Sequence, residues 1–172
     1  MLLNLKVYRF ANIISSYRFK KITYYTVKFE DEEVPLFLQF LNKHKGEQYA
    51  ENLAIIRAWL QKLGEEIGAD ERYFRNEAAR GGDARALPPP AKYINVDCSL
   101  RLYCMRVNAR VVILFNGGDK TAQTAQDCEN VRPHFLLANK LTQAIDQAIK
   151  DREIRFKDND DLILDEGTTL AI

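Results

Sequence analysis

Six basic side chains lie on and beside two consecutive runs of strand-forming residues in the second half of the chain. They are Lys92, Arg101, Arg106, Arg110, Lys120 and Arg132, with Tyr93 and Tyr103 among them. A guanidinium group offers a planar fork of donors that matches phosphate oxygens, and an ammonium group adds a compact positive charge. This combination suits the binding of a phosphate-bearing partner and the stabilisation of charge on a reacting phosphate. The alternative interpretation is structural, because charged residues on strands also prevent aggregation between sheets.

The spacing of these residues limits how many of them can share one face of a sheet. Arg101 and Tyr103 are two positions apart, so in a regular strand their side chains point to the same face. Arg106 has the opposite parity and can join them only if a bulge changes the alternation.

Other catalytic motifs are absent or incomplete. The run Gly117-Gly118-Asp119-Lys120-Thr121 resembles the end of a phosphate-binding loop, but Asp119 separates the glycine from the lysine. The sequence has no G-x-S-x-G motif, and His134 has no nucleophile at a diagnostic spacing. We interpret His134 as a capping or surface residue near the start of a helix.

The cysteine and histidine content argues against a metal site. Cys98, Cys104 and Cys128 form no CxxC pair, and the chain has two histidines, His44 and His134. We therefore expect free, mostly buried thiols in a reducing compartment, with no metal and no cofactor.

The composition fits an ordinary folded protein with segregated charge. The chain has 172 residues, 47% hydrophobic and 28% charged, with a formal net charge of +1. Residues 30–71 hold ten acidic and four basic side chains. Residues 72–121 hold four acidic and nine basic side chains, and residues 151–172 hold seven acidic and three basic ones. A basic middle segment is what a phosphate-bearing partner requires, although scattered surface charge explains the same counts. No stretch suits a signal peptide or a membrane span, so we expect a cytoplasmic protein that does not contact a membrane.

Hydrophobic periodicity predicts the order of the elements. Alternation predicts a strand at 23–30, a short helix follows at 36–42, and helical spacing predicts a longer helix at 47–67. Residues 70–76 add a turn capped by Asp70, and residues 77–86 are expected to form a mobile loop.

The second half is predicted to be a β-hairpin followed by a helix. Strands are expected at 99–107 and 110–115, joined by Asn108-Ala109 and ended by the run 116–119. A helix is predicted at 132–151. We expect an α+β fold with a single domain, in which an N-terminal helical hairpin and a C-terminal helix pack on a small, mainly antiparallel sheet. The domain is placed at residues 23–152, with an unassigned extension at 1–22 and an acidic tail at 153–172 that could supply an edge strand.

The hairpin resembles the RelE/HigB-type toxins of type II toxin-antitoxin systems. The resemblance rests on the run LRLYCMRV at 100–107, a short turn, the run VVILF at 111–115 and Lys120-Thr121 leading to a C-terminal helix. The preceding helical hairpin and the proline-containing approach with Lys92 also match, so the resemblance covers residues 23–150. Residues 1–22 and the acidic tail have no counterpart in that family.

The resemblance implies an endoribonuclease that cuts messenger RNA on the ribosome by attack of a 2′-hydroxyl on the adjacent phosphate. It implies catalytic roles for Arg101, Lys120 and Tyr103. It also implies RNA-binding roles for Lys92, Arg106, Arg110 and Arg132. The expected partners are the ribosome, messenger RNA and an antitoxin of helix-turn-helix type. The alternative is a non-catalytic RNA- or protein-binding module of the same fold.

Overall fold

The fold is organised around a seven-stranded sheet in a computed structural model that describes residues 8–77, 84–158 and 160–172. In spatial order the strands are β3 (Arg75–Asn76), β4 (Arg85–Leu87), β5 (Leu100–Arg106), β6 (Val111–Asp119), β2 (Thr23–Phe29), β1 (Phe10–Arg18) and β9 (Leu170–Ala171). Neighbouring strands are antiparallel except β2 and β6, which are parallel. The chain is therefore a single small α+β domain with a mostly antiparallel sheet, as predicted.

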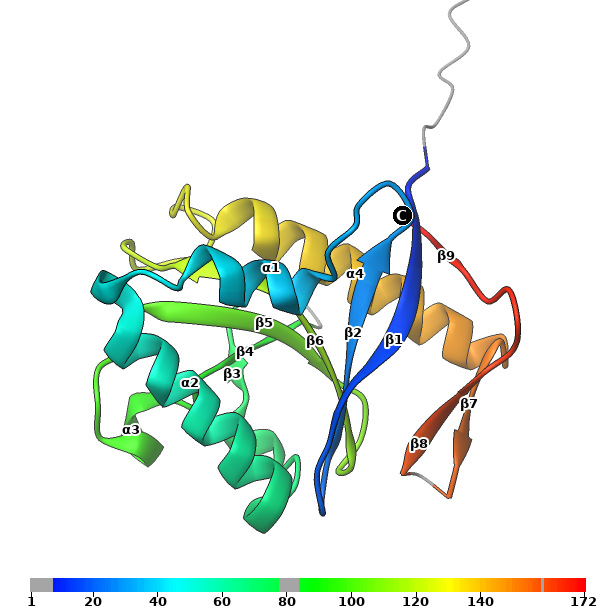
Figure 1. Ribbon diagram of the computed structural model, residues 1–172, viewed down its shortest axis with the longest axis horizontal. Helices are drawn as coiled ribbons and strands as arrows, with labels where there is room; N and C mark the ends of the chain where they lie inside the picture. Colours follow the sequence, from blue (N-terminus) through cyan, green and yellow to red (C-terminus); the bar gives the residue numbers. More distant parts are fainter. Residues whose placement is uncertain (1–7, 78–83, 159) are drawn as a thin grey trace, which may run out of the picture.

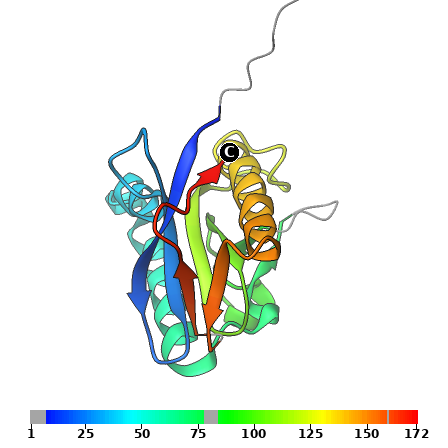
Figure 2. The same cartoon turned by 90° about the vertical axis from the view of Figure 1, so that its right-hand side faces the viewer.

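Helices cover both faces of this sheet (Figures 1 and 2). One face carries α1 (Leu36–Lys43) and α2 (Ala50–Lys62), and the other carries α4 (Arg132–Lys150). A 3-10 turn (Glu47–Tyr49) precedes α2, and a π-helical turn (Leu63–Ile67) continues it. A second 3-10 turn (Glu71–Tyr73) and the short α3 (Ala91–Ile94) flank the β3–β4 edge. The predicted helices at 36–42, 47–67 and 132–151 are thus confirmed.

Alternating side chains of the central strands fill two separate hydrophobic cores. Tyr24 and Val112 pack beneath α1 and α2, whereas their neighbours Tyr25 and Ile113 pack beneath α4. The central strands are apolar on both parities because helices cover them on both sides. This double burial makes β5 and β6 a rigid base for the residues at their ends.

The N-terminal residues extend the sheet beyond the domain expected from the sequence. Residues 1–22 were left outside the domain, whereas Phe10–Arg18 forms β1 and pairs with β2 along its length. A bulge between Ser15 and Tyr17 interrupts the pairing. This irregularity, together with two consecutive serines, weakens the alternation that marks a strand.

The acidic tail also contributes strands, but in two places. β7 (Ile154–Lys157) and β8 (Asp161–Leu164) form a separate two-stranded sheet. β9, at the end of the same tail, pairs with β1 and forms an edge of the main sheet.

The strand β6 runs through the residues that were expected to end it. Asn116-Gly117-Gly118-Asp119 stays in the sheet, with Arg101 paired to Gly118 and Leu102 to Gly117. A Cβ atom on Gly117 would collide with the carbonyl oxygen of Arg101. The glycine is needed here because β5 and β6 approach closely beside a register shift between Leu102 and Cys104.

Local predictions about turns and thiols are confirmed. The Asn108 side chain closes the β5–β6 turn by accepting from the N–H groups of Arg110 and Val111, at 2.8 and 2.9 Å. Asp70 caps the following turn by accepting from the N–H of Arg72. All three cysteines are free and buried.

Candidate functional site

Arg101 and Lys120 meet on one carboxylate, that of Glu77. Arg101 Nε lies 3.0 Å from Glu77 Oε1, and Lys120 Nζ lies 2.5 Å from Glu77 Oε2. Arg101 comes from β5 and Lys120 follows β6, while Glu77 follows β3. The backbone N–H of Lys120 donates to the carbonyl of Ser99 at 2.8 Å, which extends the β5–β6 ladder to the site. The pairing of these two strands therefore sets the spacing of the two cations.

The three charged groups are largely withdrawn from water. The side chain of Glu77 is 5% exposed, that of Arg101 12% and that of Lys120 13%. Arg101 Nη1 also donates to the carbonyl oxygens of Cys98 and Leu100, at 2.6 and 3.0 Å. These bonds hold the guanidinium in one orientation, and low exposure limits the screening of its charge by solvent.

A polar cavity of about 430 Å³ adjoins this triad. It is lined by Arg75, Asn76, Glu77, Pro90, Lys120, Gln123 and Thr124. Arg75 donates to the carbonyl oxygens of Pro88 and Pro89, at 2.8 and 3.0 Å. Burial, followed by the nearby charge of Arg101, lowers the pKa of Arg75 from its ordinary value. Among the described residues, Arg75, Arg101 and Lys120 gather around the carboxylate of Glu77, a grouping of positive charge that favours an anionic ligand.

Tyr103, the third predicted catalytic residue, lies in the core. It is 0% exposed, and its ring packs 5.7 Å from that of Phe135 on α4. Burial, followed by the charge of Glu77, raises the pKa of its hydroxyl. That hydroxyl has no hydrogen-bond partner within the described part of the chain. In this conformation Tyr103 presents no atom to a ligand outside the core.

Arg106 and Arg110 lie at the opposite end of the β5–β6 hairpin from Arg101 and Lys120. Arg101 pairs with Gly118 whereas Arg106 pairs with Val112, and five positions along the strand place the two arginines roughly 15 Å apart. Arg106 donates to the carbonyl of Ala69 and forms an ion pair with Glu71.

Arg110 and Arg132, two more of the predicted RNA-binding residues, also bond to other residues of the protein. Arg110 forms an ion pair with Asp160. Arg132, the first residue of α4, donates to the carbonyl of Gln126 at 3.2 Å. Arg101 and Arg106 lie at different ends of β5, so the bulge in this strand does not bring them into one site.

Lys92 lies over the last ring in a row of three aromatic side chains next to the cavity. The row is Trp59, Tyr73 and Tyr93, with ring centroids 5.8 Å apart for the first pair and 5.4 Å for the second. Each ring has a cation over it, namely Lys62 at 5.1 Å, Arg72 at 5.8 Å and Lys92 at 4.9 Å. The N–H of Tyr93 donates to the carbonyl of Pro90, a residue that lines the cavity. We call these three rings and three cations the aromatic row.

Two members of the site, Arg75 and Glu77, were missed from the sequence. Glu77 begins the segment that was expected to be a mobile loop, and nothing in its neighbours distinguishes it from a surface acid. Residues 78–83 of that segment lie outside the described residues, and its end is not a loop, because Arg85 and Ala86 lie in strand β4. Glu77 reaches Arg101 because β3, β4 and β5 pair in the sheet, and this tertiary pairing leaves no local motif in the sequence.

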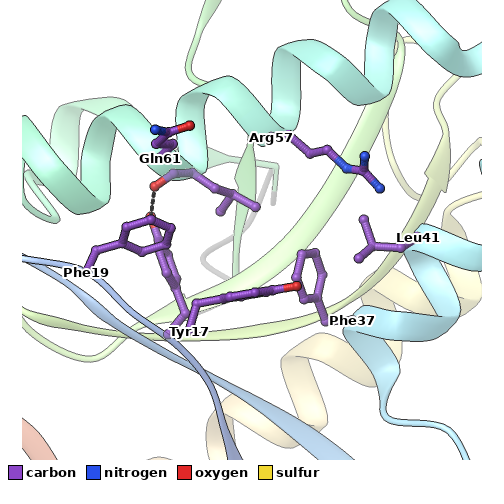
Figure 3. A pocket seen from close by; sticks show the side chains of 8 residues that line it. Tyr17, Phe19, Phe37, Leu41, Arg57 and Gln61 are labelled. Carbon is purple, nitrogen blue, oxygen red and sulfur yellow. Dashed lines mark hydrogen bonds between the residues drawn. The ribbon is translucent and has the colours of Figure 1, made fainter.

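A second cavity, of about 200 Å³, lies between the β1–β2 turn, α1 and α2 (Figure 3). Four of its eight lining residues are aromatic, and it shares no lining residue with the polar cavity.

Comparisons with protein-family models, curated proteins and solved structures returned no match. The assignment to the RelE/HigB-type toxins therefore stays a prediction. Within residues 8–77, 84–158 and 160–172, no helix is long and apolar enough to cross a membrane. The same residues contain no group of three or more histidine, cysteine or acidic side chains arranged to hold a metal ion.

Proposed function

We propose that this chain is an endoribonuclease of the RelE/HigB toxin type whose reacting phosphate binds at the Glu77 cavity. The observation that supports this is the convergence of Arg101 and Lys120, both expected from the sequence to act on phosphate, on one buried carboxylate. A cation pair aimed at a single anionic group beside a polar cavity is the arrangement that phosphoryl chemistry uses.

In this proposal a phosphodiester replaces Glu77 as the partner of the two cations. Arg101 and Lys120 then bind the non-bridging oxygens, and the released carboxylate of Glu77 faces the ribose. Glu77 accepts the proton of the 2′-hydroxyl as its oxygen attacks phosphorus, and the bond from phosphorus to the 5′-oxygen breaks. Lys120 supplies the proton to the leaving 5′-oxygen, so the products are a 2′,3′-cyclic phosphate and a 5′-hydroxyl.

The aromatic row supports a single-stranded substrate. Proteins that bind single strands combine cations that follow the backbone with aromatic rings on which bases stack. Here Tyr93 is 39% exposed beside Lys92, and the row begins next to Pro90 at the cavity. A strand lying along the row would deliver one phosphate to the cavity.

In this proposal the partners expected from the family resemblance bind the same surface. The ribosome would present messenger RNA to the cavity, and a helix-turn-helix antitoxin would silence the protein by laying an acidic segment over the cations near Lys120 and Lys92.

A non-catalytic RNA- or protein-binding module is the second candidate, and one observation favours it. The Arg101 guanidinium makes its three hydrogen bonds to Glu77, Cys98 and Leu100, all within the protein. An arginine bonded in this way can serve as a structural element alone.

Induced expression in bacteria separates the two candidates. The endoribonuclease predicts growth arrest with cleavage of translated messages, and the double variant Arg101→Gln, Lys120→Gln should relieve both. A wild-type protein that leaves growth and messages intact would contradict the catalytic proposal.

A further inference from the structure

The second cavity is built as a slot for one aromatic ring. β1 and the turn after it contribute Tyr17 and Phe19, α1 contributes Phe37 and Leu41, and α2 contributes Leu60 (Figure 3). The ring of Tyr17 meets that of Phe37 edge to face, with centroids 6.2 Å apart and planes at 82°. Aromatic rings prefer edge-to-face or offset contacts, so a further ring placed between these walls can pair with them in the same way.

Among the described residues that line this slot, Tyr24 is the one with a buried polar side chain, and its hydroxyl already has a partner. The hydroxyl of Tyr24 donates to the carbonyl of Leu60 at 2.8 Å, so it requires no ligand or water. Tyr24 is 0% exposed and Phe37 4% exposed, which leaves an apolar interior. A cavity of about 200 Å³ is slightly larger than the roughly 150 Å³ apolar cavity that accepts benzene, and smaller than a drug-sized pocket.

The mouth of the slot is positively charged. Arg57 on α2 extends over the opening toward Leu41 (Figure 3). Among the described residues its guanidinium has no hydrogen bond or ion pair, and the lining contains no acidic side chain. Gln61 lies one helical turn further on and adds an amide donor at the same rim. An unpaired arginine beside an apolar cavity favours an anionic group attached to the buried ring.

We propose that this slot binds a small ligand with a single aromatic ring that carries a carboxylate. The ring fills the space between Tyr17, Phe37 and Leu60, and the carboxylate bonds to the fork of Arg57. This inference does not rest on the proposed ribonuclease activity, because the two cavities share no residue.

The test measures binding of phenylacetate, 2-phenylethanol and acetate to the full chain by isothermal titration calorimetry and by NMR shift changes. A probe of about ten non-hydrogen atoms should bind with a Kd of millimolar order or better. Phenylacetate should bind at least about tenfold more tightly than 2-phenylethanol, since its carboxylate forms a charge-assisted hydrogen bond with Arg57. Acetate should not bind measurably, because it has no ring to bury.

Variants on α2 locate the site. Arg57→Gln should weaken phenylacetate binding about tenfold or more and leave 2-phenylethanol unchanged. Lys62→Gln, on the same helix but outside the slot, should change neither affinity. Leu41→Trp should block both ring ligands, with circular dichroism to verify folding. Absence of phenylacetate binding, or equal binding by Arg57→Gln and Lys62→Gln, would overturn the proposal.

Discussion

Lys120 Nζ lies 2.5 Å from Glu77 Oε2, and the two side chains are 13% and 5% exposed. Arg101 holds the other oxygen of the same carboxylate at 3.0 Å. The proposed function depends on this contact, because it has a phosphodiester take the place of the Glu77 carboxylate between the two cations.

Removing Glu77 should destabilise the protein strongly, because two withdrawn cations would lose their common partner. Glu77→Ala should lower the free energy of unfolding by about 3 kcal/mol, measured by urea denaturation. The matched control is Asp165→Ala, which breaks the ion pair to Arg155 at 2.6 Å. That pair is 52% and 60% exposed, so its loss should cost less than about 1 kcal/mol. Equal losses for the two variants would show that the Glu77 triad contributes nothing beyond a surface pair.

Replacing Tyr103 by phenylalanine should leave activity intact. The hydroxyl is buried and has no partner in the described chain, so its removal relieves a desolvation penalty of about 1 kcal/mol. The variant should unfold at an equal or higher urea concentration than the wild type and should cleave RNA at the same rate. A large loss of cleavage without loss of stability would restore the catalytic role inferred from the family resemblance.

Adding a methyl group at Gly117 should disrupt the geometry of Arg101. The new Cβ would collide with the Arg101 carbonyl in the neighbouring strand, so Gly117→Ala should cost about 3 kcal/mol or more. At Gly46 the same substitution meets only the flexible Gln48 side chain and should cost less than about 1 kcal/mol. Similar thermal stabilities for the two variants would contradict the close approach of β5 and β6.

His134 should remain neutral well below the usual pH for a histidine. Its Nε2 lies 3.1 Å from Lys43 Nζ, and burial followed by the charge of Lys43 lowers its pKa to about 4. A lowered histidine pKa means that the folded state resists protonation, so stability is complete above pH 6.5 and declines as the pH falls toward 4.

NMR titration of the His134 ring measures this directly. The ring protons should titrate near pH 4, and Lys43→Met should move the midpoint toward 6.5. A midpoint near 6.5 in the wild type would contradict the burial of this ring.

The aromatic row should contribute to single-stranded RNA binding. Tyr93→Ala should reduce affinity by about 1–3 kcal/mol, the loss typical of one stacked base, in fluorescence anisotropy with a labelled oligonucleotide. Tyr8, 52% exposed and outside the row, supplies the control. Tyr8→Ala should bind RNA as the wild type does. If both variants bind equally, the row is not the path of the strand.

Strong periodicity made the helices predictable. The apolar spacing of Leu53, Ile56 and Leu60 marked α2, and Leu141 and Ile145 marked α4; these residues are buried as expected. β1 was missed because its bulge between Ser15 and Tyr17 interrupts the alternation.

The site was less predictable than the helices. Arg101 and Lys120 stood out as cations on a hairpin, but their meeting point depends on Glu77, 24 residues before Arg101 in the chain. Such a contact is a product of tertiary pairing, and no local pattern encodes it. Arg101 and Arg106 lie at different ends of β5, a separation along the strand that the parity argument did not address. Parity paired Arg101 with Tyr103, yet the latter is sealed beneath α4.

RNA cleavage and RNA binding by Glu77→Gln test whether Glu77 is the base at a phosphate-binding site. The substitution keeps the shape of the side chain but removes its charge and its capacity to accept a proton. Translated messenger RNA on ribosomes is the cleavage substrate, with product ends mapped by primer extension, and a short labelled RNA reports binding. If Glu77 is the base, Glu77→Gln should bind RNA as well as or better than the wild type and cleave it about 10²- to 10⁴-fold more slowly. Lys120→Gln should lose both binding and cleavage. Cleavage by Glu77→Gln at the wild-type rate, or no cleavage by the wild type under any of these conditions, would contradict the account.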